Sequence, residues 1–331
     1  MTRFITQTIE PWMPLGALKA KGDYAKIAQS AGWQVLPLAR YNDQRFDDQI
    51  RQEKINQWLQ RTQPGDTVLH QFPTYMSASF EQSWLASLKV RQLRSVLLIH
   101  DIEPLRLHKA DPWEFDLLKG YDLIITHSSA MITSLKEHGV TGSFVVQPFF
   151  DYLSESPRLA RYSHTINFAG TFQKSPWLQE YNDYPIEVFG HQPKKWQGLS
   201  LPESIHLRGN YDPDQLPQEL NNGFGLLWDD DFDDRYYRQY TRINAPHKAS
   251  LYLSAGLPLI AWKKSAIGKI ITKNQIGFTI NRLEELPQVE NISARQYENW
   301  QANLSPFREK ISRGGFTLAT LTQIKKQLDL I

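Results

Sequence analysis

Hydrophobic positions in the first half of the chain fall into short apolar runs separated by segments with helical spacing. The runs are typical of buried strands and cover residues 3–9, 33–39, 67–72, 95–100, 123–126 and 144–147. The segments with helical spacing cover residues 23–31, 47–61, 80–93, 112–118 and 129–138. Because each connection is long enough for a right-handed crossover, the pattern predicts a parallel sheet with helices on its faces.

A second series follows residues 148–164, where Pro157 and several polar residues indicate a linker. Its predicted strands are residues 165–169, 186–189, 205–208, 223–228, 257–262 and 277–280, and its predicted helices are 177–181, 213–220, 246–255, 266–273 and the amphipathic stretch 315–328. A chain of 331 residues exceeds a single typical core. We therefore predict two doubly wound α/β domains, at residues 1–150 and 160–312.

Composition and charge exclude several classes of protein. Hydrophobic residues make up 41% and charged residues 22%, which is ordinary globular usage, and a net charge of +2 offers no broad field for nucleic acid. The absence of cysteine excludes disulfides and thiolate chemistry. The N-terminus does not resemble a signal peptide, and no apolar run approaches the ~20 residues of a membrane span. We expect a cytoplasmic protein.

Residues 244–262 combine a helix start with a buried strand, an arrangement typical of anion binding. Asn244 is expected to cap the helix, Pro246 to lie in its first turn, and Gly256 to end it. Lys248 places a cation in the first turn of the helix, where the helix dipole disfavours positive charge. This arrangement makes sense if an anion lies between the lysine and the helix start. The plain alternative is an ordinary αβ unit with a surface lysine.

This segment, with others in the same order, resembles a bacterial glycosyltransferase family. The resemblance is carried by residues 240–262, 265–267, 276–277, 72–75, 99–105, 168–170 with Lys174, and 223–229. The family includes the glucosyltransferases that extend O-linked GlcNAc on serine-rich repeat adhesins and the related β-1,6-galactofuranosyltransferases. It implies a GT-B fold, in which two Rossmann-like domains face a central cleft, with the C-terminal helix 315–331 packing back on the first domain.

The resemblance also implies that the second domain binds the nucleotide sugar and that Lys248 holds its diphosphate. The residues expected around that ligand are Asn244, Pro246, His247, Ala249, Ser250, Tyr211, Lys174 and Gly170. Tyr211 could contact the uracil or ribose, or be a turn aromatic with one face buried. Lys174 could add a second positive charge, or be a solvated loop lysine.

Polar residues at the end of the predicted strand 95–100 are candidates for catalysis. Sugar transfer passes through an oxocarbenium-like state, and a base must take the proton of the acceptor hydroxyl. Asp101 is the first candidate for that base, Glu103 the second, and His100 a positioning partner. Alternatively, Asp101 caps the following loop and His100 bonds the backbone.

The first domain, residues 1–150, is expected to bind the acceptor. Gly16, Ala17 and Lys19 lie in a predicted loop over residues 12–23, where small residues allow a sugar to approach closely. At another strand end, Thr74 and Tyr75 are expected to line the acceptor pocket, although Thr74 could be no more than a turn residue.

Five aspartates within residues 229–234 invite a metal-binding interpretation, since a D-x-D pattern can bind Mg²⁺ or Mn²⁺ in transferases. The run instead fits an exposed, mobile segment, because it follows a strand and precedes the Tyr- and Arg-rich residues 235–240, which could form a lid over the donor. The resemblance points to a family in which a lysine, rather than a metal, offsets the diphosphate. We expect no metal and no cofactor.

Together with these observations, the resemblance implies a metal-independent, inverting hexosyltransferase that moves glucose from a UDP-sugar to a GlcNAc-modified, Ser/Thr-rich adhesin. The family resemblance also implies that the protein forms a homo-oligomer, a dimer or tetramer. We expect neither a nucleic-acid partner nor a membrane span. One alternative is a galactofuranosyltransferase or another hexosyltransferase of surface polysaccharide synthesis. A UDP-sugar epimerase is a second, and it would need carboxylates around the donor sugar. A noncatalytic transferase subunit is a third, and it would lack the phosphate-binding lysine.

Overall fold

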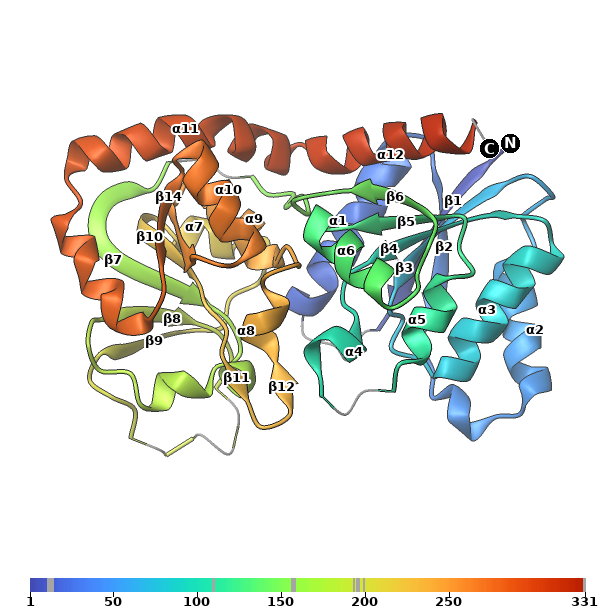
Figure 1. Ribbon diagram of the computed structural model, residues 1–331, viewed down its shortest axis with the longest axis horizontal. Helices are drawn as coiled ribbons and strands as arrows, with labels where there is room; N and C mark the ends of the chain where they lie inside the picture. The colour runs from blue at the N-terminus through green and yellow to red at the C-terminus, as the bar shows by residue number, and fades with distance from the viewer. Residues whose placement is uncertain are drawn as a thin grey trace. The chain divides into compact units, whose positions relative to one another are not determined.

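The chain forms two compact units, each built on a six-stranded sheet (Figure 1). The structure is a computed structural model that describes residues 1–10, 15–108, 111–155, 159–192, 194, 197–198 and 200–329. The first unit comprises Met1–Pro148 together with Phe316–Ile331, and the second comprises Phe149–Gly315. The first unit is therefore made of two segments that are far apart in the sequence.

All strands of the first unit run parallel, in the order β2-β1-β3-β4-β5-β6. They are β1 (Arg3–Ile9), β2 (Gln34–Ala39), β3 (Thr67–Phe72), β4 (Arg94–Ile99), β5 (Leu123–Thr126) and β6 (Ser143–Val146). Every residue of β3 is buried, as expected for a central strand covered on both faces. The six predicted strands are confirmed, and their parallel direction brings all carboxyl ends to one edge of the sheet.

Helices surround this sheet. They are α1 (Leu15–Ser30), α2 (Asp48–Trp58), α3 (Ala78–Val90), α4 (Glu103–Arg106), α5 (Trp113–Leu118), α6 (Ser129–Glu137) and α12 (Gly315–Leu328), with a 3-10 turn η1 (Asp43–Arg45). Of these, α2, α3 and α6 begin where a side chain caps a free amide. Asp47 caps α2 by accepting from the amide of Ile50 at 2.9 Å. In Figure 1, α2, α3 and α5 lie side by side. The loop predicted at residues 12–23 is wrong, because α1 already begins at Leu15.

The sheet of the second unit is also parallel, in the order β14-β13-β10-β7-β8-β9. Its strands are β7 (Arg161–Ala169), β8 (Ile186–Phe189), β9 (Ile205–Gly209), β10 (Asn222–Leu227), β13 (Leu259–Trp262) and β14 (Gly277–Ile280). A separate antiparallel hairpin joins β11 (Asp231–Phe232) to β12 (Arg235–Tyr236). The predicted linker ends earlier than residue 164, because β7 starts at Arg161.

Helices of the second unit include the predicted one over the candidate anion site. They are α7 (Leu216–Glu219), α8 (Tyr237–Tyr240), α9 (His247–Ala255), α10 (Ala266–Asn274) and α11 (Ala294–Ser312), with 3-10 turns η2 (Phe172–Lys174), η3 (Pro176–Gln179) and η5 (Leu283–Asn291). Gly256 ends α9 with a left-handed φ of 80°, which confirms its predicted role. The helix expected at residues 177–181 is only the 3-10 turn η3, and α11 was not predicted.

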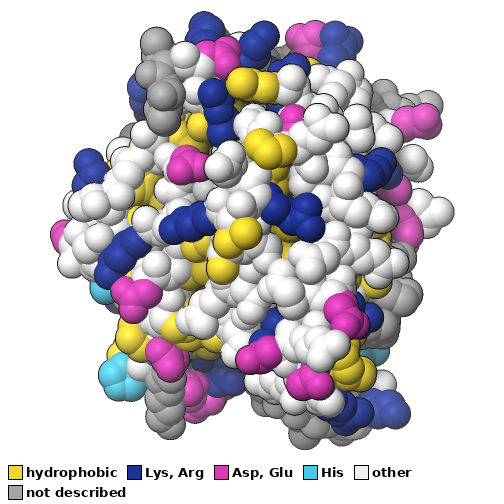
Figure 2. Space-filling model, turned by 90° about the vertical axis from the view of Figure 1, so that its right-hand side faces the viewer, with side chains coloured by type: hydrophobic (Ala, Val, Ile, Leu, Met, Phe, Trp, Pro, Cys, Tyr) yellow, Lys and Arg dark blue, Asp and Glu magenta, His cyan; other side chains and the backbone are white. Residues whose placement is uncertain are grey.

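An aromatic core holds the second sheet to its helices. Phe168, Phe224, Trp228 and Tyr297 are almost completely buried within it. On the face shown in Figure 2, basic and acidic side chains are interspersed, in keeping with the small net charge. Within the part of the chain that the structure describes, no helix combines the length and the apolar character needed to cross a membrane.

Candidate functional site

Lys248 lies in the first turn of α9, at the carboxyl edge of the second sheet. Its ammonium nitrogen is 4.8 Å from the centroid of the Phe168 ring and 3.6 Å from Oδ1 of Asp229. Gly170, which follows β7, lies beside it. A Cβ atom on Gly170 would come within 2.9 Å of the Phe168 ring and 3.8 Å of Lys248 Nζ. A glycine at this position therefore leaves the approach to the ammonium group open.

A small pocket opens next to this ammonium group. It is lined by Leu227, Asp229, Thr241, Pro246, Lys248, Ser265 and Ile267. These residues come from the carboxyl end of β10 and from the starts of α9 and α10. Ligands of open parallel α/β sheets bind at this edge, and helix starts favour anions. The geometry suits an anionic group held by Lys248.

The structure corrects the predicted start of α9. Pro246 occupies the cap position with φ −66° and ψ 136°, and no side chain caps the helix. Asn244 is therefore not the cap, and Pro246 lies one residue before the first turn. The side-chain oxygen of Asn244 is buried and has no hydrogen-bond partner among the described residues. This amide is thus a polar group that a ligand at the helix start could satisfy.

The other predicted residues of α9 brace the helix against residues 150–152. The imidazole of His247 stacks on Tyr152 with 4.8 Å between ring centroids, and its Nε2 lies 3.1 Å from the carbonyl oxygen of Asp151. Ser250 donates its hydroxyl to the carbonyl of Phe150 at 2.5 Å. The amide of Ala249 donates to the carbonyl of Pro246 at 2.9 Å. These groups fix the orientation of the turn that carries Lys248.

Tyr211 and Lys174 lie on the same edge of the second sheet. Tyr211 follows β9 and its ring centroid is 5.9 Å from that of Phe189, at the end of β8. Lys174 lies in η2, just after β7, and its ammonium group is 5.7 Å from the centroid of the Tyr237 ring. Strand ends thus bring both residues to the edge that carries Lys248.

The acidic run forms part of the β11–β12 hairpin, and Asp231 and Asp233 are exposed, in keeping with the exposed segment that its sequence suggested. Several of its carboxylates also meet cations of the same unit. Asp230 lies 3.2 Å from Arg238, whose guanidinium packs 4.3 Å from the Trp228 ring centroid. Asp233 and Asp234 lie 3.4 and 3.3 Å from Arg235. Among the described residues, no three acidic or histidine side chains are grouped so that they could hold a metal ion.

The three predicted catalytic residues follow β4 in the first unit. Arg106 bridges two of them, donating to Asp101 at 2.9 Å and to Glu103 at 2.6 Å. Ile102 occupies the cap position of α4 without a side-chain bond, so Asp101 is not a helix cap. His100 Nε2 lies 3.0 Å from the side-chain oxygen of Gln71. Two carboxylates thus share one guanidinium at the carboxyl edge of the sheet.

Glu114, on α5, contacts this cluster through the backbone of Glu103. Its Oε2 accepts from the backbone amide of Glu103 at 2.9 Å. Burial raises the pKa of Glu114 to about 8, and the negative charges of Glu103 and Glu81 act in the same direction, whereas the Glu103 amide and Arg106 oppose them. At neutral pH this carboxyl group therefore holds a proton in the folded protein.

Replacing Glu114 by glutamine is expected to flatten part of the pH dependence of stability. Because the folded-state pKa lies above the ordinary value of 4.5, the carboxyl contributes stability at low pH that is lost as the pH rises through about 8. Glutamine accepts the Glu103 amide bond without ionising. We expect thermal unfolding to show a higher Tm than wild type near pH ~9 and a similar Tm near pH ~5. Parallel curves for the two proteins would contradict this assignment.

The predicted acceptor residues differ in what they can contact. Lys19 is buried in α1 and pairs with Asp23 at 2.9 Å. Thr74 is fully buried and donates its hydroxyl to Glu81 at 2.6 Å, so this hydroxyl holds the loop after β3. Tyr75 is 37% exposed on the same loop. Gly16 and Ala17 lie in the first turn of α1, and their surroundings fall outside the described part of the chain.

Sequence patterns did not single out Lys21, Arg40 or Glu81, which meet at this loop. Lys21 is buried and donates to the carbonyl of Pro73. Its pKa is lowered to about 8 by burial, against the opposing charges of Glu81 and Asp101. Glu81 is completely buried and lies 2.9 Å from His70 Nε2. The signal that could have found this cluster is the pair His70 and Gln71 inside an otherwise apolar central strand.

Comparison with known families matches both units. The glucosyltransferase 3-like N-terminal domain matches residues 2–149, and the glucosyltransferase 3-like C-terminal domain matches residues 166–324. These two matches cover nearly the whole chain.

Individual proteins agree with this match. The chain is 28% identical over 307 residues to glucosyltransferase 3 of Streptococcus parasanguinis, covering 90% of each protein. It is 25% identical over 287 residues to the β-1,6-galactofuranosyltransferase WbbI of Escherichia coli K12, covering 83% of this chain and 84% of that protein. Among solved structures, α,α-trehalose-phosphate synthase (UDP-forming) from Burkholderia vietnamiensis is similar in fold, with a TM-score of 0.62, 10% identity and coverage of 98% and 99%. The two parallel six-stranded sheets are thus those of a GT-B fold.

Proposed function

The chain belongs to the glucosyltransferase 3-like family of glycosyltransferases, and we propose that within this class it transfers a hexose, most simply glucose, from a UDP-sugar to GlcNAc carried on Ser/Thr-rich protein. The relatives support this choice, because the protein from Streptococcus parasanguinis is a glucosyltransferase. In keeping with the resemblance, the enzyme would work as a cytoplasmic homo-oligomer, a dimer or tetramer.

The observation that carries the proposal is the setting of Lys248. Its ammonium group lies at a helix start, at the carboxyl edge of a parallel sheet, beside a pocket and a glycine that leaves the approach open. A diphosphate carries the charge that such a site favours. The partnerless oxygen of Asn244, with Tyr211 and Lys174 on the same edge, would serve the rest of the nucleotide.

The proposed reaction is a single displacement with inversion. The acceptor hydroxyl oxygen forms a bond to the anomeric carbon while the bond from that carbon to the β-phosphate oxygen breaks. Asp101 takes the hydroxyl proton, and UDP leaves with its added negative charge beside Lys248. Glu103 is the second candidate for the base. Arg106 holds both carboxylates in place through its two hydrogen bonds.

Metal independence is supported by the partners of the acidic run. Asp229 faces Lys248, Asp230 faces Arg238, and Asp233 and Asp234 face Arg235. These carboxylates neutralise cations of their own unit, and Lys248 supplies the positive charge that a divalent ion would otherwise bring to the diphosphate. Asp229 would then compete with the diphosphate for the same ammonium group.

Replacing Asp229 by asparagine is expected to tighten UDP binding. The pair is loose and partly exposed, with side chains 24% and 21% accessible, so its loss should lower the Kd of UDP about two- to fivefold. Calorimetric titration with UDP, with EDTA and then with Mn²⁺, measures the change. Asp234→Asn removes a charge from the same run without touching Lys248 and serves as the control. Weaker binding, confined to the titration with Mn²⁺, would make Asp229 a metal ligand instead.

A donor screen tests the proposed function directly. The enzyme is incubated with a GlcNAc-peptide and, separately, UDP-glucose, UDP-GlcNAc, UDP-galactose and UDP-galactofuranose, with UDP release and peptide mass as readouts. The expected result is a hexose-sized mass gain with UDP-glucose in the presence of EDTA. A gain with UDP-galactofuranose alone would favour the activity named for the Escherichia coli relative. UDP-GlcNAc converted to another sugar without peptide would indicate an epimerase.

A further inference from the structure

Tyr75 has an unusual backbone conformation for a bulky residue. It follows β3 in the first unit and has a φ of 61°, in the left-handed region. That region is costly for a bulky side chain, and such residues persist where the surrounding structure holds them and where function requires them. Its side chain is not fully buried in the core, because the residue is 37% exposed. The strain must therefore be held in place by contacts of the loop.

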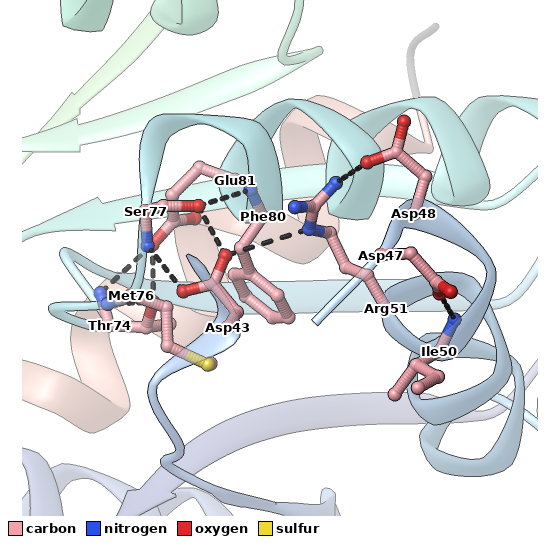
Figure 3. A network of polar contacts seen from close by, with 10 residues as sticks. All are labelled: Asp43, Asp47, Asp48, Ile50, Arg51, Thr74, Met76, Ser77, Phe80 and Glu81. Atoms are coloured by element: carbon pink, nitrogen blue, oxygen red, sulfur yellow. Dashed lines mark hydrogen bonds and ion pairs between the residues drawn. The ribbon is translucent and has the colours of Figure 1, made fainter. Parts of the chain in front are cut away.

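Those contacts hold every residue of the loop from Pro73 to Ser77 through a backbone atom. Figure 3 shows the contacts made by Thr74, Met76 and Ser77. The bonds run from Lys21 to the carbonyl of Pro73, from the amide of Thr74 to Glu81 at 3.0 Å, from Arg40 to the carbonyl of Tyr75 at 3.0 Å, from the amide of Met76 to the Thr74 hydroxyl at 3.3 Å, and from the amide of Ser77 to Asp43 at 2.9 Å. Four of the five partners come from outside the loop, so contacts with the rest of the first unit fix its conformation.

The two carboxylates that accept these amides are themselves fixed. Asp43 and Glu81 are both buried, and Figure 3 shows them pointing into the loop from η1 and α3. Arg51 lies 3.5 Å from Asp43, and His70 lies 2.9 Å from Glu81. Buried carboxylates are stable only with such partners. The loop thus rests on a rigid, charge-compensated base.

The ring of Tyr75 lies between two groups of charges. Lys21 Nζ is 4.8 Å and the Arg40 guanidinium carbon 6.0 Å from its centroid. Burial raises the pKa of the phenol to about 12, Asp101 and Glu103 add to the shift, and Arg106 and Arg40 oppose it. Tyr75 follows β3 and Asp101 follows β4, and these neighbouring parallel strands pair Phe72 with Ile99 at their ends. The ring therefore lies at the same edge of the sheet as the candidate base Asp101, where an acceptor hydroxyl must be placed.

We propose that Tyr75 is a fixed stacking platform for the acceptor sugar, and that Lys21 and Arg40 are positioning residues that hold it. This inference rests on the proposed function and extends it to the class of acceptor: a pyranoside whose apolar C–H face lies on the ring. The electron-rich face of an aromatic ring attracts the polarised C–H bonds of such a sugar. A platform that is rigid before binding loses little conformational entropy when the sugar arrives.

The variants Tyr75→Gly and Tyr75→Phe separate the contribution of the ring from the effect of the strained backbone. Tyr75→Gly removes the ring and tolerates the left-handed φ, so the loop keeps its shape. We expect the acceptor KM to rise about tenfold or more, while Tyr75→Phe stays within about threefold of wild type. Gln92→Gly is the matched control, because Gln92 also has a positive φ, of 54°, but lies at the opposite end of the sheet, just before β4. It should leave the acceptor KM unchanged.

A double-substitution cycle tests the positioning role of Lys21. Lys21→Met should raise the acceptor KM in the wild-type background, since the loop loses its bond at Pro73, and should have no further effect in the Tyr75→Gly background. A residue that merely stabilises the fold would act equally in both. The Kd of UDP, measured for each variant, reports whether the donor-binding unit is intact.

The outcomes distinguish this inference from the proposed function. If wild type transfers sugar and Tyr75→Gly has a normal acceptor KM, the platform is wrong and the function stands. If wild type transfers nothing from any UDP-sugar, saturation-transfer NMR with a GlcNAc glycoside becomes the test. A signal that Tyr75→Gly loses and Gln92→Gly keeps would support the platform alone, and equal signals in both variants would overturn it.

Discussion

Replacing Lys248 by alanine is expected to remove most of the affinity for UDP and most of the turnover. A charge-assisted contact between an ammonium and a phosphate is worth about 1.5–3 kcal/mol, which corresponds to a roughly 10- to 150-fold increase in Kd. The effect on kcat/KM should be larger than on UDP binding, because the leaving diphosphate carries more negative charge in the transition state than in the bound donor.

The measurement is a calorimetric titration with UDP alongside initial rates of UDP release. Lys248→Arg keeps the charge and should retain part of the affinity. Lys264→Ala, at an exposed position after β13, is a control for the loss of a lysine charge. UDP affinity and turnover that both survive Lys248→Ala would remove the phosphate assignment, and with it the observation on which the proposed function depends.

Replacing Asp101 by asparagine is expected to abolish transfer while UDP still binds normally. Asparagine keeps the size of the side chain and can still approach Arg106, but it cannot take a proton. General base catalysis contributes about 100- to 10,000-fold, so kcat should fall by that factor. The Kd of UDP should stay within about twofold, since the donor residues lie in the second unit.

Glu103→Gln is the matched control for Asp101, because both carboxylates bind the same guanidinium. It should lower kcat far less. If Asp101→Asn transfers at a nearly normal rate and Glu103→Gln is inactive, the base is Glu103. If neither substitution matters, the proton acceptor lies elsewhere in the first unit.

The local features of the fold could be predicted from the sequence because their causes are local. Gly256 ends α9 with a left-handed φ, and the buried run of β13 is apolar throughout. The helix α11 escaped prediction because it is largely polar and carries Pro306 inside it. The single turn α4 is too short for a helical period to be recognised. The helix predicted at residues 177–181 is only the 3-10 turn η3.

The arrangement of the candidate site could be predicted only in part. Lys248 stood out because a cation at a helix start contradicts a local preference. Its partner Asp229 is 19 positions away in the sequence. In the loop of Tyr75, Arg40 contacts a residue 35 positions away and Lys21 contacts one 52 positions away. No periodicity or cap signal encodes such long-range contacts. The acidic run shows the same limit, since no pattern in the sequence indicates that Asp230 meets Arg238.

The two-segment composition of the first unit has a consequence for how the protein is synthesised. A ribosome releases Met1–Pro148 first, yet that unit lacks α12 until Phe316–Leu328 has emerged. The intervening Phe149–Gly315 is contiguous and can complete its folding earlier. Until Phe316–Leu328 has emerged, the nascent N-terminal unit therefore leaves uncovered the surface that later buries Leu321, Ile324 and Leu328.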